Sequence, residues 1–334
     1  MLRTLFMGTP DFALPAFEVT AEATQLIAVV TQPDRPQGRG LSVVAPPVKV
    51  AALRCNIPVL QPDRIRNDPA FLVTLRQMAP DLIVVVAFGQ ILPQAVLDIP
   101  RFGCVNVHAS LLPRYRGAAP IQWAIIRGET QTGVTTMQMD AGMDTGPILL
   151  QSPTEIGPEE TADQLAARLS LLGASLLAKT LLRWETGRRD AMRQATDRNI
   201  CAALEDGVLS ATPQNNAEAT LAPPLVKEDG EIRWTDSATA IFNRWRGCVS
   251  WPGTTTFCDG VRWKVPILSV GDTTGIYGAP GEVLRLGNDG LEVATGAGYI
   301  IIRSIQPDGK RAMTVREYTA GHTVLPGTQL GRSV

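Results

Sequence analysis

The sequence has 334 residues, of which 45% are hydrophobic and 19% are charged, and its net charge at pH 7 is −1. This composition is typical of a soluble globular protein, and the length favours two domains over one. Acidic and basic side chains balance in both halves of the chain, so composition alone does not indicate a nucleic-acid partner. No run of about 18 uncharged apolar residues is present, and we therefore expect no membrane span.

The cysteine and histidine content argues against disulfides and against a metal site. Five cysteines occur without a CxxC pair, which indicates free thiols in a reducing compartment. His108 and His322 are the only histidines, too few for us to expect zinc or another metal. The N-terminal apolar segment meets Gly8-Thr9-Pro10 too early for a secretory signal, so we expect a cytoplasmic protein.

The first part of the chain alternates apolar strands with helices. Residues 81–87 form a continuous apolar run, typical of a central parallel strand covered on both faces. The alternation predicts right-handed crossovers and a doubly wound α/β sheet. We expect strands at residues 2–7, 25–31, 58–60, 81–87, 104–107, 132–139 and 147–151, and helices at residues 48–54, 69–78, 120–127 and 162–184.

A long irregular connection, residues 32–47, follows the second expected strand. Connections between strands and helices usually take about two to six residues, so a loop of this length is typically functional or disordered. Arg35 and Arg39 on this loop are predicted to reach phosphate groups, with solvated loop charges as the alternative.

The second half of the chain is richer in β-type segments. Residues 186–224 are polar, and we expect domains at residues 1–185 and 207–334, joined by a linker at 186–206. Asp-Gly pairs at 259–260, 289–290 and 308–309 stand between alternating apolar segments and predict hairpins. These features predict a small all-β barrel or sandwich, preceded by a helix near residues 237–246.

Three polar side chains are predicted to meet at the carboxyl edge of the first sheet. Asn106 and His108 end the strand at 104–107, on the same face because strand side chains alternate with a period of two. Asp144 follows in a glycine-containing turn, where it either forms an Asx turn or fixes the tautomer of His108. Ligands of open α/β sheets bind at this edge. An amide, an imidazole and a carboxylate placed together there suit acyl transfer.

Residues 110–113 follow directly and allow two interpretations. They pack as an ordinary loop, or they form one wall of a pocket for a flat heteroaromatic ligand. Leu112-Pro113 is expected to be a cis bond that shapes that pocket, and the loop at 88–93 lies at the same sheet edge. Arg114 and Arg116 add two guanidinium groups suited to carboxylate or phosphate.

Distinctive segments occur along both halves of the chain. The first half carries GTPDFA (8–13), TQPDRPQGRG (31–40), AFGQILP (87–93), NVHASLLPRYRGAAPIQ (106–122) and TGVTTMQMDAGMDTG (132–146). The second half carries EIRW (231–234), WPGT (251–254), LEVATGAG (291–298) and IQPDGKRAM (305–313). In their order and spacing these segments resemble the methionyl-tRNA formyltransferase family over nearly the whole chain, and in that family the block that contains Asn106 and His108 is highly specific for formyl transfer from folate.

The resemblance implies a Rossmann-like, doubly wound N-terminal formyltransferase domain and a C-terminal OB-like β-barrel that helps to hold tRNA. It implies that a formyl group passes from 10-formyltetrahydrofolate to the α-amine of initiator methionyl-tRNA, giving formylmethionyl-tRNA for translation initiation. It makes Asn106, His108 and Asp144 the catalytic residues. We expect a monomer that acts without a metal.

The resemblance also implies that two loops hold the folate and that the loop at 32–47 contacts the acceptor stem. The expected folate-binding residues are Ser110, Leu111, Leu112 and Pro113 in one loop and Phe88, Gly89, Gln90, Ile91 and Leu92 in the other. The expected tRNA-binding residues are Arg35 and Arg39.

Two departures from the family pattern concern tRNA rather than the chemistry. Leu41 and Ser42 stand where some relatives carry a lysine pair, and residues 221–224 stand where the family often has an aromatic residue and a lysine. The nearest alternative function is a sugar-nucleotide N-formyltransferase on the same scaffold. A glycinamide ribonucleotide enzyme would be much shorter, and a noncatalytic RNA-binding or folate-sensing protein would have no use for the three polar residues.

Overall fold

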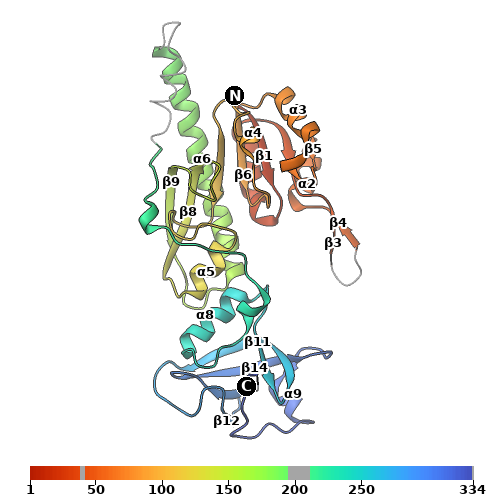
Figure 1. Ribbon diagram of the computed structural model, residues 1–334, viewed down its shortest axis with the longest axis vertical. Helices are drawn as coiled ribbons and strands as arrows, with labels where there is room; N and C mark the ends of the chain where they lie inside the picture. Colours follow the sequence, from red (N-terminus) through yellow and green to blue (C-terminus); the bar gives the residue numbers. More distant parts are fainter. Residues whose placement is uncertain (38–41, 195–210, 333–334) are drawn as a thin grey trace. The chain divides into compact units, whose positions relative to one another are not determined.

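The computed structural model describes residues 1–37, 42–194 and 211–332, and their contacts divide the chain into two compact units (Figure 1). Unit 1 comprises Met1–Gly117, Gln131–Glu155 and Ala166–Ala222, and unit 2 comprises Ala118–Thr130, Ile156–Leu165 and Pro223–Val334. The two units therefore exchange short stretches of chain, whereas the sequence predicted contiguous domains. Each unit is described by itself.

Unit 1 is built on one seven-stranded sheet with helices between its strands. The strand order is β5-β2-β1-β6-β7-β8-β9, parallel from β5 to β7 and antiparallel for β8 and β9. The strands are β1 (Arg3–Gly8), β2 (Gln25–Val30), β5 (Val59–Leu60), β6 (Leu82–Val86), β7 (Cys104–His108), β8 (Gln131–Gln138) and β9 (Ile148–Glu155). The helices are α1 (Leu14–Ala23), α2 (Pro47–Arg54), α3 (Pro69–Met78) and α4 (Gln94–Leu97), with single 3₁₀ turns at Asp11–Ala13, Ile65–Asn67 and Asn216–Glu218. The predicted doubly wound α/β class is confirmed.

Alternate side chains of the central strands face opposite layers of unit 1. Met7 and Val85 join a buried cluster with Phe71 and Leu75 of α3, because successive strand residues point to opposite faces. On the other face, Phe6 packs edge-on against Phe17 of α1, with ring centroids 5.8 Å apart. The long helix α6 (Ala162–Gln194) packs on this second face: a Cβ on its Gly173 would lie 3.0 Å from Val107 of β7 and 3.5 Å from Val134 of β8. Figure 1 shows α6 running beside β8. The hydroxyls of Thr136 and Thr180 meet there at 2.9 Å.

Helix α6 is longer than its leucine periodicity predicted. The expected end was residue 184, but the helix continues to Gln194 and so includes the first residues of the expected linker. Its segment Ala162–Trp184 has a mean hydropathy of 1.5 and passes the length and composition test for a membrane span. Half of that segment is buried within the protein, which is also typical of a core helix.

The connection at 32–47 contains regular structure that the sequence did not predict. β3 (Arg35–Gln37) pairs in antiparallel fashion with β4 (Ser42–Val44), so the irregular-loop interpretation of these residues was wrong. Arg39 lies between the two strands, outside the described residues. The predicted phosphate contact of Arg39 therefore stays a prediction.

Unit 2 is built on an antiparallel sheet that curls into a barrel. The strand order is β10-β11-β14-β13-β12, with β15 paired to β14. The backbone of Leu330 donates to Gly281 next to β12, and that of Gly331 donates to Phe257 in β10, so the C-terminal segment joins the two edges. The strands are β10 (Thr255–Cys258), β11 (Val261–Asp272), β12 (Val283–Leu286), β13 (Leu291–Ala294), β14 (Tyr299–Pro307) and β15 (Met313–Thr314). All three predicted Asp-Gly hairpins lie between paired strands, and the OB-like class is confirmed.

Three helices complete unit 2: α5 (Pro120–Ile126), α8 (Ala238–Cys248) and α9 (Val315–Thr319), with a 3₁₀ turn at Lys227–Gly230. α5 packs on α8 so closely that a Cβ on Gly247 would lie 2.6 Å from Cγ1 of Ile126. Arg246 of α8 is buried and donates to the backbone oxygens of Gly157 (2.8 Å) and Glu160 (3.1 Å). Burial lowers the pKa of Arg246, and the charge of Glu160 opposes that shift.

Candidate active site

Strand β7 presents Asn106 and His108 at the carboxyl edge of the unit 1 sheet. Asn106 lies between Val85 of β6 and Met137 of β8, and His108 pairs with Thr135 of β8. The side chain of His108 is buried and that of Asn106 is half-buried. Their common face follows from the two-residue period of the strand, as predicted.

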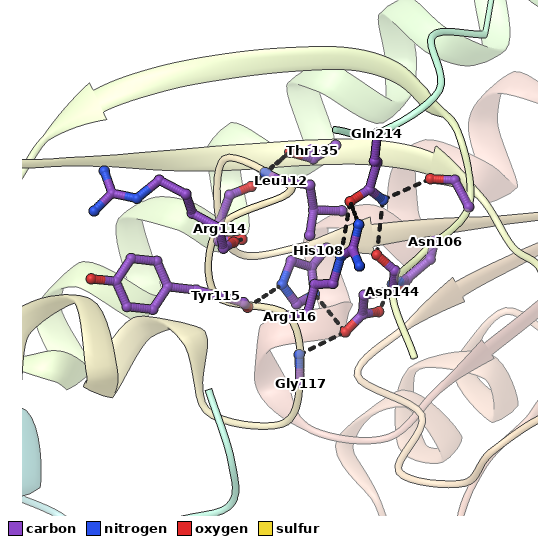
Figure 2. Close-up of polar contacts among 12 residues, drawn as sticks. Asn106, His108, Leu112, Arg114, Tyr115, Arg116, Gly117, Thr135, Asp144 and Gln214 are labelled. Atoms are coloured by element: carbon purple, nitrogen blue, oxygen red, sulfur yellow. Dashed lines mark hydrogen bonds and ion pairs between the residues drawn. The ribbon is translucent and has the colours of Figure 1, made fainter. Parts of the chain in front are cut away.

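Asp144 reaches these side chains from the connection between β8 and β9. Its Oδ1 lies 3.4 Å from Nδ2 of Asn106, and its Oδ2 lies 3.6 Å from Nδ1 of His108 (Figure 2). The backbone N–H of Gly117 donates to Oδ2 at 2.9 Å. Asn106, His108 and Asp144 therefore form one cluster, which we call the polar trio.

A second aspartate makes the turn that the sequence assigned ambiguously. Asp140 Oδ1 accepts from the backbone of Gly142 at 3.0 Å, which is an Asx turn, and from Thr145 Oγ1 at 2.7 Å. Asp144 has a left-handed backbone, with φ of +53°, a conformation that aspartate tolerates better than most residues. The turn-forming role thus belongs to Asp140, and the carboxylate of Asp144 faces the histidine.

The ring of His108 is oriented by a backbone carbonyl. Nε2 lies 2.9 Å from the oxygen of Tyr115, and since a carbonyl only accepts, Nε2 carries a proton and donates. Nδ1 is thereby left facing Asp144. Tyr115 itself has φ of +62°, which costs about 1–3 kcal/mol for a non-glycine residue and must be held in place by neighbouring contacts.

The expected folate loop at residues 110–113 is fixed by β8 and β9. Thr135 Oγ1 donates to the oxygen of Ser110 (2.7 Å) and accepts from the backbone of Leu112 (3.1 Å). Gln151 Nε2 donates to the oxygen of Leu112 at 2.8 Å. The Leu112-Pro113 bond is cis, as predicted, and the side chains of Leu111 and Pro113 are half-buried.

The second expected folate loop, residues 88–92, divides into buried and exposed positions. Phe88 and Leu92 belong to the core under α3 and α4, whereas Gly89 is exposed and Ile91 is 78% exposed. Gln90 uses its side-chain amide inside the protein: Oε1 accepts from the backbone of Ile65 (2.9 Å), and Nε2 donates to the oxygens at 62 and 63 (3.3 and 3.4 Å). Gln90 thus ties two loops together in this structure.

Arg35 of β3 connects to the same loop through Gln32. Arg35 Nη2 donates to Gln32 Oε1 at 3.3 Å, and Gln32 Nε2 donates to the oxygen of Phe88 at 3.3 Å. Beside them, Lys49 pairs with Asp34 at 2.7 Å. Hydrogen bonds from Gln61 and then Lys49 lower the pKa of Asp34. The base of the β3–β4 hairpin is therefore tied to the sheet edge, a network that the sequence did not predict.

Two further residues at the polar trio were not predicted as part of it. Arg116 is buried and donates to Gln214 Oε1 through Nε (3.0 Å) and Nη2 (2.7 Å). Gln214 Nε2 in turn donates to the backbone oxygens of Asp144 (2.8 Å) and Gly146 (2.7 Å). The sequence marked Arg116 as a possible carboxylate or phosphate ligand, but nothing in it linked residue 214 to the site.

No group of three or more His, Cys, Asp or Glu side chains among the residues described in the structure is arranged to hold a metal ion.

Family models match most of the chain. Residues 4–181 match the formyl transferase family, and residues 224–323 match the C-terminal domain of formyl transferases. The segment with Gln214 lies outside both matches.

Full-length relatives share nearly half of the sequence. The methionyl-tRNA formyltransferase of Syntrophus aciditrophicus is 48% identical over 99% of this chain and 99% of its own. That of Geobacter sulfurreducens is 47% identical over 99% of this chain and 98% of its own.

Solved structures with lower identity share the fold. An N-formyltransferase from Helicobacter canadensis, solved with folinic acid and dTDP-3-aminofucose, has a TM-score of 0.61 at 18% identity, over 92% of this chain and 100% of that one. HypX from Aquifex aeolicus in complex with tetrahydrofolic acid has a TM-score of 0.56 at 16% identity, over 95% of this chain and 47% of that one. Because the chain is 47–48% identical over nearly its full length to the methionyl-tRNA formyltransferases of Geobacter sulfurreducens and Syntrophus aciditrophicus, it belongs to the methionyl-tRNA formyltransferase family.

Proposed function

We propose that this protein transfers the formyl group of 10-formyltetrahydrofolate to the α-amine of initiator methionyl-tRNA, acting as a monomer in the cytoplasm. The observation that carries the proposal is the convergence of the polar trio at the sheet edge, in a chain related over its full length to methionyl-tRNA formyltransferases. An amide at 3.4 Å and an imidazole at 3.6 Å from one carboxylate are the groups that acyl transfer needs.

The amine attacks in its neutral form, and a free α-amine titrates near ~7.7–8, so part of it is available at neutral pH. Attack on the formyl carbon places negative charge on the formyl oxygen. Asn106 Nδ2 carries two N–H bonds, one of them directed at Asp144, and the other is the donor that we assign to this oxygen. A preorganised donor of this kind is worth roughly 3 kcal/mol of barrier.

His108 supplies positive charge beside the same oxygen when both of its nitrogens are protonated. The carboxylate of Asp144 faces Nδ1 and would accept a hydrogen bond from the proton on Nδ1, while Nε2 donates to the backbone oxygen of Tyr115. Asp144 also assists the proton that leaves the attacking amine on its way to the folate nitrogen. The bond between Nε2 and Tyr115 implies that the ring contributes through its charge unless the loop at 114–117 moves when substrates bind.

We assign the expected folate residues by their exposure. Leu111, Pro113, Gly89 and Ile91 present surface to a ligand, whereas Phe88, Gln90, Leu92, Ser110 and Leu112 support those loops from beneath. For tRNA, Arg35 of β3 and Arg39, which lies outside the described residues, supply phosphate contacts, and unit 2 supplies the second binding surface.

The test is a formylation assay with 10-formyltetrahydrofolate and either methionyl-tRNA or a dTDP-amino sugar as acceptor. We expect turnover with the tRNA alone, and a preference for the sugar would overturn the proposal. Asn106→Ala and His108→Ala should each lower kcat by about 100-fold or more. His322→Asn is the matched control, because it changes the protein's other histidine, which is exposed on unit 2.

The tRNA contact is tested separately with arginine variants. Arg35→Ala and Arg39→Ala should raise KM for methionyl-tRNA several-fold and leave KM for the folate unchanged, since a phosphate contact adds binding that is common to ground and transition states. Arg54→Ala, at an exposed position on α2, is the control. An increase confined to the folate KM would contradict the assignment.

A further inference from the structure

The backbone around the polar trio is held by a segment that lies far away in the sequence. Residues 212–222, which we call the strap, belong to unit 1 and run beside the loop at 113–117. Arg116 N donates to the oxygen of Thr220 (2.8 Å), and Ala222 N donates to the oxygen of Arg116 (2.7 Å). At its other end the strap pairs Thr212 with Ile148 of β9. The strap thus bridges the two loops from which Tyr115 and Asp144 come.

Gln214 is the strap residue whose side chain contacts the loops that carry Asp144 and Tyr115. Its amide nitrogen donates to the backbone oxygens of Asp144 and Gly146, and its amide oxygen accepts twice from Arg116 (Figure 2). Every polar atom of this side chain is therefore used, and each bond goes to one of the two loops. An amide is the only neutral side chain of this length with both a double donor and an acceptor.

These bonds close a ring around the trio. The ring of His108 donates to the backbone oxygen of Tyr115, and the next residue, Arg116, donates to the side chain of Gln214. Gln214 donates to the backbone oxygen of Asp144, whose carboxylate faces His108. Tyr115 and Asp144 both have left-handed backbones, with φ of +62° and +53°. Such conformations persist only where surrounding contacts fix them, and the strap supplies those contacts.

We propose that Gln214 is a positioning residue for formyl transfer, which acts by fixing the backbone of Asp144 and, through Arg116, the carbonyl that orients His108. The inference rests on the proposed function, because it gives the trio its catalytic task. It makes Gln214 part of the active site, although this residue follows the expected linker and lies outside both regions that match the family models.

The first test separates the hydrogen bonds of Gln214 from its packing. Gln214→Ala should lower kcat by about 30- to 100-fold and change neither KM by more than about twofold, since a displacement of the order of 1 Å at the reacting groups has this effect on rate. Gln214→Glu keeps the shape and the acceptor for Arg116 but has no donor for the two carbonyls. We expect it to stay folded and to lose as much kcat as Gln214→Ala.

The control is Glu218→Gln, an exposed change on the same strap whose amide oxygen still accepts from Asn215. It should keep kcat within about twofold, as exposed substitutions usually do. If Gln214→Glu keeps wild-type kcat, or if Gln214→Ala raises KM and leaves kcat unchanged, the positioning role is refuted.

The second test is a double-mutant cycle with Asp144→Asn. Because one of the two routes by which Gln214 acts runs through Asp144, Gln214→Ala should lower kcat by a smaller factor in the Asp144→Asn background than in the wild type. Full additivity would mean that Gln214 does not act through the backbone of Asp144 and would overturn the inference. If Asp144→Asn alone leaves kcat unchanged, the proposed function of the trio fails first, so the two failures are distinguishable.

Discussion

Gly117 joins the strap to the polar trio and offers the sharpest single perturbation. Its φ of +122° is a region that only glycine adopts easily, and a Cβ built on it would lie 2.6 Å from the oxygen of Ala222. The same residue donates its backbone N–H to Asp144 at 2.9 Å. Gly117→Ala therefore strains the backbone, pushes the loop away from the strap and withdraws a donor from the carboxylate.

The magnitude follows from these three effects. The backbone conformation costs about 1–3 kcal/mol in a non-glycine residue, and the lost bond between Ala222 and Arg116 adds about 1 kcal/mol. A hydrogen bond to a charged group contributes about 1.5–3 kcal/mol. If that last contribution supports the transition state, its loss corresponds to a decrease in kcat of roughly 10- to 150-fold.

The assay measures kcat for methionyl-tRNA formylation beside the thermal midpoint of unfolding. Gly103→Ala is the matched control in the same unit, because its φ is +73° but its Cβ would meet only the flexible end of Gln138, at 3.2 Å. We expect Gly103→Ala to lower stability by about 1 kcal/mol and to keep kcat within about twofold. The reasoning is refuted if Gly117→Ala turns over normally, or if Gly103→Ala loses as much kcat.

Three other outcomes are expected. In ¹⁵N spectra recorded where both rings are neutral, His108 should carry its proton on Nε2 and His322 on Nδ1, since these atoms face carbonyl oxygens at 2.9 and 3.1 Å; the same tautomer in both would contradict the geometry. Burial raises the pKa of the Cys104 thiol to about 12, so the unfolded chain, whose thiol titrates near ~8.5, loses this proton first. The free energy of unfolding should therefore fall as pH rises above about 9. In Cys104→Ala this fall should be less steep, by up to about 1.4 kcal/mol per pH unit. Equal slopes for the two proteins, measured by urea titration at each pH, would argue against the burial of this thiol. Arg246→Met should lower the free energy of unfolding by about 2–5 kcal/mol, because two partly buried carbonyls lose their donor; unchanged urea midpoints would refute this.

The strands and their order of appearance follow from local patterns, and those parts of the fold were predictable. The end of α6 was not, because leucines stop recurring near residue 182 while the backbone remains helical to Gln194. Apolar periodicity reports which face of a helix is buried, so it does not mark where the helical backbone ends. The exchange of residues 118–130 into unit 2 was also beyond prediction, since it depends on the packing of α5 against α8 and on the close approach at Gly247.

Within the site, the predictable part was the part set by strand geometry. The period of two places Asn106 and His108 on one face, and the resemblance supplied Asp144. Arg116 was noticed for the geometry of its guanidinium group, but its partner Gln214 lies 98 residues away in a polar stretch that resembles a linker. A glutamine in such a stretch carries no local signal, because the two carbonyls that it binds are exposed by a turn elsewhere in the chain.

Asp140 and Asp144 show why residue type and turn composition do not decide a role. Both stand in the same connection, each two positions before a glycine, and either could have formed the turn or faced the histidine. What separates them is the supply of donors: Gly142 and Thr145 satisfy Asp140 locally, whereas the donor at 2.9 Å from Asp144 is the backbone of Gly117, 27 residues earlier. Gln90 shows the converse arrangement, since the nearby backbone at 62–65 bonds to both ends of its side-chain amide; the folate contact that the resemblance implied for Gln90 stays a prediction. A polar side chain in a glycine-rich loop is thus available to a ligand only when the surrounding backbone leaves its hydrogen-bonding groups unused.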